Sequence, residues 1–327
     1  MASIKDVARE AGVSVATVSR VINKSGIVTE ETRKIVTDAI EKLNYRTNLF
    51  GKGLRRGETK IIMVMLSSLA NTFCSSVIRS IDKCAGAKGY YTMICTTDGI
   101  KEKEEYYINF ALNGLFDGII VLNSSLSEKR MAQLSKQIPT VQCNEVADSV
   151  STPYVTIDNE LAAYDAVNYL VSHGRRRVAL FTVDNTLLST VERTKGYRKA
   201  LEKNGIDYND RLVIFGNYGY RNAVDVFAEF MKSKVRFDAV FAISDRMAAG
   251  AMCVLLENKY RIPADAEVIG FDNTDISYTT NPRLTTISQP HSQLGINAFE
   301  QLENQIQNKK TKNIILTHKL VERESTL

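Results

Sequence analysis

Residues that bind metals or carry redox chemistry are scarce in this sequence. It has no tryptophan and three histidines, and its five cysteines are widely spaced without a C-x-x-C pair. Structural zinc sites and redox dithiols need their ligands or thiols at short spacing. We therefore predict no metal centre and interpret the thiols as buried side chains: Cys74, Cys84, Cys95, Cys143 and Cys253.

Long apolar runs and catalytic motifs are also missing. No stretch approaches the length that crosses a bilayer, and no apolar signal segment follows Met1, so we expect a cytoplasmic protein with no membrane partner. The sequence has no G-x-S-x-G, no phosphate-binding loop and no G-x-G-x-x-G after a predicted strand. An enzyme acting on a sugar would need an acid and a base, and no such pair stands out. We predict a binding protein without cofactors rather than an enzyme.

Positive charge is concentrated at the N-terminus. Residues 1–60 hold 12 Lys and Arg against 7 Asp and Glu, whereas the 30 cations and 30 anions of residues 61–327 cancel. The whole excess of +5 therefore falls in the first sixth of the chain. This asymmetry favours an anionic partner for that part, nucleic acid before a membrane surface, with a solvated basic face as the alternative.

Three short helices are predicted in the same region. Ser3, Ser14 and Thr29 can cap their N-termini, and Gly12 permits a tight turn between the first two. This order is typical of a helix-turn-helix. Apolar residues at helical spacing predict the inner faces: Val7, Ala8, Ala11, Val18, Val21, Ile22, Ile35, Val36, Ala39, Ile40 and Leu43.

A helix-turn-helix places its second helix in the major groove of double-stranded DNA. Burial of Val18 and Val21 turns the opposite face outward, where Arg20 can pair with both acceptors of a guanine. Small apolar residues on that face can contact a thymine methyl, and hydroxyls suit phosphate. The alternative is a small helical bundle with a solvated Arg20. The predicted DNA-binding residues are Ser14, Val15, Ala16, Thr17, Ser19, Arg20 and Asn23.

From Lys60 onward, apolar strands alternate with helical stretches, which indicates parallel sheets covered by helices on both faces. Phe116–Asn123 and Phe237–Ser244 repeat one pattern: an F-D entry, an apolar strand and a polar end. Ligands bind at the carboxyl ends of such strands, so we expect Asn123 and Ser244 on opposite walls of one cleft. The clearest predicted strands are Ile61–Leu66, Tyr91–Cys95, Gly118–Leu122, Val178–Thr182, Ala239–Ile243 and Glu267–Phe271.

Two segments, IKDVAREAGVSVATVSRVIN (Ile4–Asn23) and VTEETRKIVTDAIEKLNYR (Val28–Arg46), resemble the DNA-binding headpiece of the LacI/GalR family of bacterial transcription regulators. The resemblance covers essentially the whole chain. It implies an all-α helix-turn-helix headpiece and an α/β periplasmic-binding-protein-like core of two Rossmann-like lobes. The implied domains are a headpiece at 1–46, a hinge at 47–59 and a core at 60–327, with lobe 1 at about 60–157 and 290–318 and lobe 2 at about 160–287 and 320–327. The chain would cross between lobes near Thr156–Asn159, Thr286–Pro290 and Thr317–Val321.

The resemblance also implies a small-molecule effector site between the lobes. A guanidinium and a carboxylate in a cleft can each hold two neighbouring hydroxyls of a sugar, so Arg193 and Asp272 are the strongest candidates. Their alternative is an internal ion pair, and for Phe73 and Tyr218 the alternative is ordinary packing. Matching the family pattern position by position gives Ser67, Phe73, Asn123, Asn144, Arg193, Tyr218, Ser244 and Asp272.

Two departures from the family pattern leave the effector open. Thr72 stands where the family often has proline, and an acidic residue is common near the position of Asn144, so the hydroxyl-binding pattern is incomplete. A sugar or sugar phosphate is the first choice, and a nucleobase or another small polar metabolite is the alternative. The helix predicted over Ser292–Ile306 lacks the residues by which the catabolite-control branch recognises a phosphocarrier protein, so no protein co-repressor is expected.

The segment NLFGKGLRRG (Asn48–Gly57) is both basic and apolar, unlike an inert linker. The resemblance implies a hinge that becomes a short helix on the operator and wedges a leucine into the minor groove. Leu54 matches that leucine. Backbone contacts around it are expected from Asn48, Lys52, Arg55 and Arg56.

This hinge carries Gly51 where the family commonly has alanine, and Gly53 adds a second glycine. Each glycine disfavours a helix by about 1 kcal/mol relative to alanine. We therefore expect Gly51→Ala to tighten operator binding and to reduce the response to effector. Titration of operator DNA with and without effector measures both quantities, and no change in either would show that the hinge does not fold on DNA in this way.

Together these features predict a ligand-responsive transcription regulator, most simply a repressor that binds a pseudo-palindromic operator as a homodimer. The sequence after Val321 has no leucine heptads, which favours a dimer over a tetramer. The rival is a small-molecule binding or sensor protein of the periplasmic-binding-protein type without DNA function. That class would need neither a helix-turn-helix nor a basic hinge.

Overall fold

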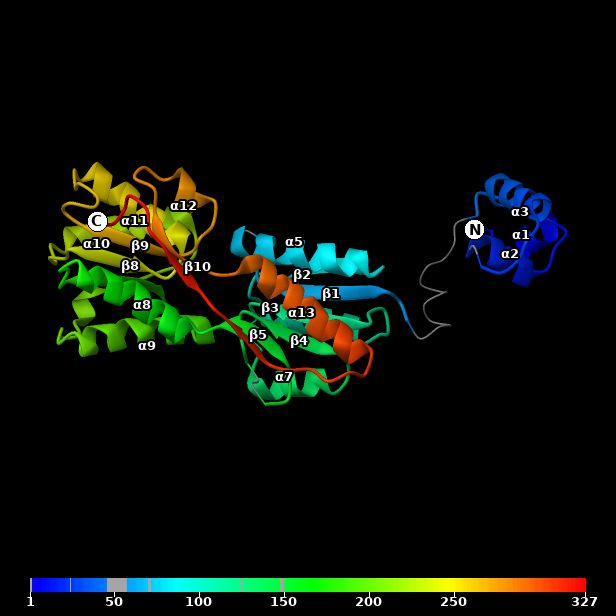
Figure 1. Ribbon diagram of the computed structural model, residues 1–327, viewed down its shortest axis with the longest axis horizontal. Helices are drawn as coiled ribbons and strands as arrows, with labels where there is room; N and C mark the ends of the chain where they lie inside the picture. The colour runs from blue at the N-terminus through cyan, green and yellow to red at the C-terminus, as the bar shows by residue number, and fades with distance from the viewer. Residues whose placement is uncertain (1, 24, 46–57, 70–71, 125, 148–149) are drawn as a thin grey trace. The chain divides into compact units, whose positions relative to one another are not determined.

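The computed structural model describes residues 2–23, 25–45, 58–69, 72–124, 126–147 and 150–327. The chain divides into two compact units, Met1–Thr59 and Lys60–Leu327, and each is described by itself (Figure 1). Among the described residues, no helix is both long enough and apolar enough to cross a membrane.

The described part of the first unit forms three helices, α1 (Ile4–Glu10), α2 (Val15–Ile22) and α3 (Glu30–Lys42). The predicted caps are confirmed, because each hydroxyl accepts a hydrogen bond from the amide three residues later. At α1 the Asp6 carboxylate also accepts from the Ser3 amide at 2.9 Å, which completes a capping box. Gly12 in the turn has a φ of 64°, a value that favours glycine, as predicted.

One small apolar core holds these helices together. Its buried residues are Val7, Ala8, Ala11, Val18, Val21, Val36 and Ala39, with Ile22, Ile40 and Leu43 partly buried around them. The prediction for Ile35 is wrong, since this side chain is 45% exposed. Two short helices cover only one narrow stripe of α3, centred on Val36 and Ala39, and Ile35 lies at the edge of that stripe.

The second unit contains two six-stranded sheets, and the first sheet with its helices is called lobe 1. Its strand order is β11-β5-β4-β3-β1-β2, and every pairing is parallel. Helices α5 and α13 pack together over one face (Figure 1), and α6 and α7 cover the other. The strands are β1 (Ile61–Leu66), β2 (Tyr91–Thr96), β3 (Gly118–Leu122), β4 (Thr140–Cys143), β5 (Tyr154–Ile157) and β11 (Ile314–Leu316); the helices are α5 (Thr72–Ala87), α6 (Lys101–Ala111), α7 (Glu128–Ser135) and α13 (His291–Ile306).

Lobe 2 is the second sheet with its helices. The strand order is β12-β10-β9-β8-β6-β7, parallel except for the antiparallel pair β10 and β12. Helices α8 and α9 cover one face, and α10 and α11 cover the other (Figure 1). The strands are β6 (Val178–Val183), β7 (Val213–Gly216), β8 (Ala239–Ala242), β9 (Glu267–Asp272), β10 (Thr285–Ser288) and β12 (Lys319–Val321); the helices are α8 (Asn159–Ser172), α9 (Leu188–Lys203), the short 3-10 helix η1 (Asp210–Leu212), α10 (Tyr220–Lys232), α11 (Asp245–Glu257) and α12 (Ile276–Thr279).

The chain passes between the lobes after β5, after β10 and after β11. The carboxyl ends of the parallel strands therefore lie near these crossings between the lobes. Polar residues follow several of the strands. The six predicted strands are all present, each within one residue of its expected ends. The six further strands of the two sheets have three or four residues each, too short for a clear apolar pattern.

Candidate functional site

A cavity of about 300 Å³ opens where the carboxyl ends of the two sheets meet. Both lobes contribute to its wall. The lining residues are Ser67, Ser68, Phe73, Cys74, Asn123, Asn144, Glu145, Leu187, Ser189, Arg193, Tyr218, Gly219, Arg246, Asp272 and Gln289. All of the predicted effector residues except Ser244 are in this wall.

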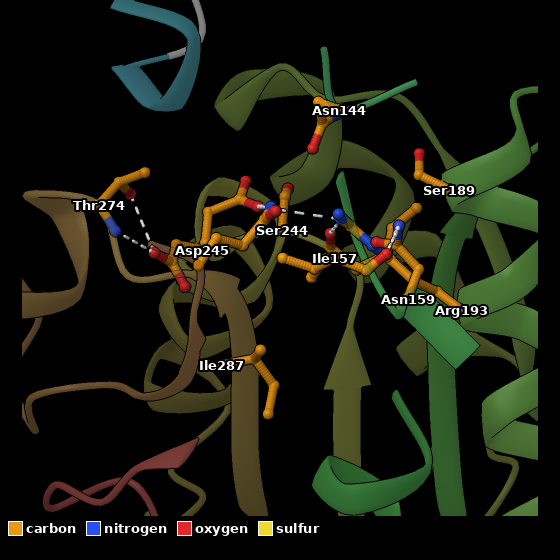
Figure 2. A network of polar contacts seen from close by, with 12 residues as sticks. Asn144, Ile157, Asn159, Ser189, Arg193, Ser244, Asp245, Thr274 and Ile287 are labelled. Atoms are coloured by element: carbon orange, nitrogen blue, oxygen red, sulfur yellow. Dashed lines mark hydrogen bonds and ion pairs between the residues drawn. The ribbon is translucent and has the colours of Figure 1, made fainter. Parts of the chain in front are cut away.

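Arg193 is held rigidly in the lobe 2 wall. It is 4% exposed, and its guanidinium stacks 3.6 Å from the centre of the Phe271 ring. Its Nε donates to Asn159 Oδ1 at 3.0 Å, and its Nη1 donates to the Ile243 carbonyl at 2.7 Å, as Figure 2 shows for the contact with Asn159. Among the described contacts none satisfies Nη2, which leaves that nitrogen available to a ligand.

Asp272 ends strand β9 beside Arg193. Its Oδ1 lies 3.9 Å from Arg193 Nη1, a loose ion pair, and accepts a hydrogen bond from Gln289 Nε2 at 2.7 Å. Its φ of 105° is unusual for a residue other than glycine and is fixed in part by His291, whose Nε2 donates to the Asp272 carbonyl at 2.6 Å. Burial raises the pKa of Asp272, and Arg193 opposes that shift. The ion pair proposed as the alternative is therefore present, but it is loose, and both side chains can still form hydrogen bonds with a ligand.

Two buried acceptors in the wall have no hydrogen-bond donor in the part of the chain that the structure describes. Asn144 Nδ2 donates to Asn123 Oδ1 at 2.7 Å, and Asn123 Nδ2 donates to Cys74 Sγ at 3.2 Å. In this series of hydrogen bonds Asn144 Oδ1 has no partner among the described residues, and neither has Gln289 Oε1. A buried polar atom without a partner is unfavourable by about 1–3 kcal/mol, so both oxygens favour a ligand that donates hydrogen bonds.

Glu145 connects the lobes across the cavity. It follows β4 in lobe 1, yet its carboxylate accepts from the Ser189 amide at 3.1 Å and from the Ser189 hydroxyl, both in the first turn of α9 in lobe 2. The N-cap residue of α9, Leu187, supplies no side-chain hydrogen bond, so Glu145 caps this helix from the other lobe. Glu145 thus supplies an acidic side chain to the cavity one position after Asn144, where the family pattern led us to look for one.

The two predicted aromatics meet the cavity with part of their surface. Phe73 is 1% exposed and packs edge-on against His291, with ring centres 5.0 Å apart. The Tyr218 hydroxyl shares a hydrogen bond of 3.1 Å with the Thr190 hydroxyl, and burial raises the pKa of Tyr218. Phe73 and Tyr218 therefore both pack against other protein residues and line the cavity.

Ser244 lies outside the cavity. Its hydroxyl accepts a hydrogen bond from the Met247 amide at 3.3 Å and caps helix α11. The repeat between the two lobes correctly placed a polar residue at the strand end, but in lobe 2 the helix begins at once and uses the hydroxyl. Arg246, two residues later in the first turn of α11, reaches the cavity instead.

Asp245 lies buried behind this wall at 1% exposure. Its carboxylate accepts hydrogen bonds from the Thr274 amide at 2.6 Å and hydroxyl at 3.0 Å, and from the Thr286 hydroxyl; Figure 2 shows the two bonds to Thr274. These contacts fix the loop that follows Asp272. Burial, helped by repulsion from Asp272, raises the pKa of Asp245 to about 8.

This raised pKa predicts a pH-dependent stability. An aspartate with a pKa near 3.8 when unfolded and about 8 when folded loses its contribution to the free energy of unfolding as pH rises from 4 to 8. The slope reaches at most about 1.4 kcal/mol per pH unit. We expect Asp245→Asn, which stays neutral, to flatten the loss of stability between pH 5 and 8 in denaturant titrations. The exposed Asp275→Asn is the matched control, and parallel pH profiles for Asp245→Asn and the unchanged protein would contradict the assignment.

The predicted DNA-facing residues lie on one side of α2 and at its two ends, where Ser14 is the N-cap and Asn23 the C-cap. Val15, Ala16 and Arg20 are exposed, and Thr17 and Ser19 are half-buried. The Ser14 hydroxyl caps the helix and bonds to the Thr17 hydroxyl at 2.9 Å, and Asn23 donates to Ser19 at 3.1 Å. The five hinge residues predicted to contact DNA lie outside the described residues: Asn48, Lys52, Leu54, Arg55 and Arg56.

Comparison with known families matches both units. The family described as periplasmic binding proteins and sugar binding domain of LacI family matches residues 59–324, and the family described as bacterial regulatory proteins, lacI family, matches residues 3–48. This chain belongs to the LacI family. It is accordingly a DNA-binding transcription regulator with a ligand-binding core.

Other LacI-family proteins are similar over nearly the whole chain. The transcriptional repressor PurR of Vibrio atlanticus is 36% identical over 311 residues, which are 94% of this chain and 93% of PurR. The solved lac repressor dimer, bound to operator and the anti-inducer ONPF, has a TM-score of 0.87 at 28% identity, covering 100% of this chain and 99% of that one. The solved complex of the regulator CelR with cellobiose has a TM-score of 0.75 at 28% identity, covering 99% of this chain and 100% of that one.

Several cavity residues of this LacI-family chain escaped prediction from the sequence. Glu145 had a signal, since it adjoins Asn144, and Gln289 lies in a predicted crossing between lobes. Ser189 and Leu187 begin a helix whose start shows no capping residue of its own. Their role in the wall follows from tertiary contact with lobe 1 and has no local sequence pattern.

Proposed function

We propose that this LacI-family regulator is a cytoplasmic repressor that binds a pseudo-palindromic operator as a homodimer, with one headpiece in each half-site. A small neutral sugar in the cavity between the lobes sets its affinity for the operator. The observation that supports this most strongly is the cavity itself, where polar atoms of both lobes converge and two buried oxygens have no hydrogen-bond partner among the described residues.

The chemistry of the wall favours a neutral ligand rich in hydrogen-bond donors. Two carboxylates, Glu145 and Asp272, and two guanidiniums, Arg193 and Arg246, balance in formal charge. The unpartnered oxygens of Asn144 and Gln289 add two acceptors. A sugar presents hydroxyls that can donate to these oxygens and accept from Arg193. The CelR complex with cellobiose shows a sugar bound by a relative, and a nucleobase is the alternative that a ligand screen distinguishes.

The contact between Glu145 and Ser189 gives the effector a way to act. It already joins the two lobes at the edge of the cavity. A ligand that touches both walls stabilises one arrangement of the lobes over others, and the difference in its affinity for those arrangements sets the size of the effect. In a dimer, a change in lobe arrangement alters the separation of the two hinges and hence the fit to two half-sites.

The experiment that tests this proposal has two stages. Genomic promoter fragments bound by the protein are recovered and titrated by fluorescence polarisation at several salt concentrations. A panel of sugars and nucleosides is screened by thermal shift, and the strongest hit is added to the titration. We expect one preferred sequence with two-fold symmetry, a steep salt dependence and a change in affinity with the hit. Binding without preference among sequences would contradict operator recognition, and a nucleoside as the strongest hit would contradict the sugar.

A further inference from the structure

Lobe 2 holds a second cavity of about 330 Å³ on the outer side of α9, here called the outer cavity. It lies between α9, strands β6 and β7 and the segment that precedes β7. None of the residues predicted for effector or DNA binding lines it.

The floor of the outer cavity comes from the edge of the sheet. Strand β7 is the edge strand, and Phe215 pairs in register with Thr182 of β6, so both side chains point to the face that α9 covers. Helix α9 packs over β6, and Phe215 beyond it stays 58% exposed. The exposed ring of Phe215 therefore offers a flat apolar surface to a ligand.

At the deep end of the outer cavity lies a hydroxyl without a partner. Thr182 is 2% exposed, and among the described residues no atom forms a hydrogen bond with its Oγ1. A buried hydroxyl in this state is unfavourable unless a ligand or water supplies a partner. It can both donate and accept.

The rim of the outer cavity is basic. Lys195 and Arg198 are exposed and lie one turn apart on α9, whereas Asp184 is the one carboxylate in the lining. The guanidinium of Arg198 lies 4.3 Å from the centre of the Tyr208 ring and donates to the Tyr208 hydroxyl at 3.0 Å, which holds it in place. The described ion pairs do not involve Lys195. The rim thus favours an anionic group on the ligand.

The outer cavity also shares a wall with the effector cavity. Thr190, in the first turn of α9, lines the outer cavity, and its hydroxyl is hydrogen-bonded to Tyr218 of the effector cavity. Thr194 donates back to the Thr190 carbonyl at 2.9 Å. The two cavities are therefore separated by one turn of helix and one side-chain hydrogen bond.

We propose that the outer cavity is a second ligand site, selective for a small hydroxylated aromatic carboxylate. The ring stacks on Phe215, the carboxylate pairs with Lys195 and Arg198, and the ring hydroxyl bonds to Thr182. This site is distinct from the effector site, and its test depends on neither the effector nor DNA.

Three probes of nearly equal size separate these contacts: 4-hydroxyphenylacetate, phenylacetate without the hydroxyl, and 4-hydroxyphenylacetamide without the charge. Ligand-detected NMR titration of the full-length protein measures each dissociation constant. For a ligand of this size we expect about 1 mM for 4-hydroxyphenylacetate and about tenfold weaker binding of phenylacetate. The amide is expected to bind more weakly than the acid.

Variants assign the binding to this cavity. In Thr182→Val the two acids should bind equally, and in Lys195→Gln the advantage of the acid over the amide should become smaller, because Arg198 remains. Lys203→Gln, which removes an exposed cation from the end of the same helix, is the matched control and should bind like the unchanged protein. No binding, or the same preferences in Thr182→Val and Lys195→Gln as in the control, would overturn the proposal.

The folding of Thr182→Val is itself informative. Replacing an unpartnered hydroxyl with a methyl group of equal size removes a buried polar atom and should raise the thermal midpoint. A lower midpoint would show that the hydroxyl already has a partner in the protein, which would contradict the proposed site.

Discussion

Arg20→Ala is expected to weaken operator binding of the dimer by about 2–6 kcal/mol, because each of two headpieces loses a bidentate guanine contact worth about 1–3 kcal/mol. Arg20 is exposed on α2, next to the exposed Val15 and Ala16. Its loss should also relax the preference for one base pair in each half-site. Polarisation titrations against the operator and its single-base variants measure both effects.

The matched control for this prediction is Arg9→Ala on α1. Arg9 is 80% exposed, and its one described ion pair is with Asp6 in the same helix. Removing it lowers the positive charge of the headpiece by the same amount, so affinity should fall by a similar factor for all DNA sequences. If Arg20→Ala behaves in the same way, Arg20 contacts the DNA backbone and does not read a base.

Arg193→Ala is expected to reduce effector affinity by at least about 100-fold, since a hydrogen bond to a charged group contributes about 1.5–3 kcal/mol and the side chain can offer more than one. The variant also leaves Asn159 Oδ1 and the Ile243 carbonyl without their present donor. Some loss of stability is therefore expected, and the thermal midpoint must be measured beside the calorimetric dissociation constant.

Asp272→Asn is also expected to reduce effector affinity, with a smaller effect on the fold. It keeps the shape of the side chain and the bond from Gln289 can be kept by the amide oxygen, so the fold should survive while affinity falls by about 10-fold to 100-fold. Asp275→Asn, three residues later and exposed, is the control. Unchanged effector binding in both Arg193→Ala and Asp272→Asn would show that the effector binds elsewhere.

Features that depend on neighbouring residues could be predicted from the sequence. The caps at Ser3, Ser14 and Thr29 and the turn at Gly12 are set by hydrogen bonds and backbone angles within four residues. The long strands of both sheets are set by uninterrupted apolar runs. The polar ends of those strands then locate most of one wall of the cavity.

Features that depend on contacts between distant segments could not be predicted in this way. Glu145 caps α9 only because two lobes meet there, and Gln289 reaches Asp272 from a segment between lobes. Ser244 shows the opposite error, since its own helix α11 uses the hydroxyl. Ile35 is apolar at the right period, but it lies at the edge of the covered stripe and stays 45% exposed.

The two proposed ligand sites differ in how the sequence could reveal them. Effector residues follow strands in a pattern that the family resemblance makes visible. The outer cavity depends on Thr182 and Phe215, which look like ordinary strand residues until their pairing and the position of α9 are known. Its basic rim is two cations among many on exposed helix faces.

The most direct test of ligand control is the operator affinity of the unchanged protein and of Asp272→Asn, measured by fluorescence polarisation while the best sugar of the thermal-shift screen is titrated in. We expect equal affinities without sugar and a change of at least about tenfold in the unchanged protein at saturation. In Asp272→Asn the same change should need about 10-fold to 100-fold more sugar. An Asp272→Asn protein that responds to the sugar like the unchanged protein would contradict the assignment of the cavity between the lobes as the effector site.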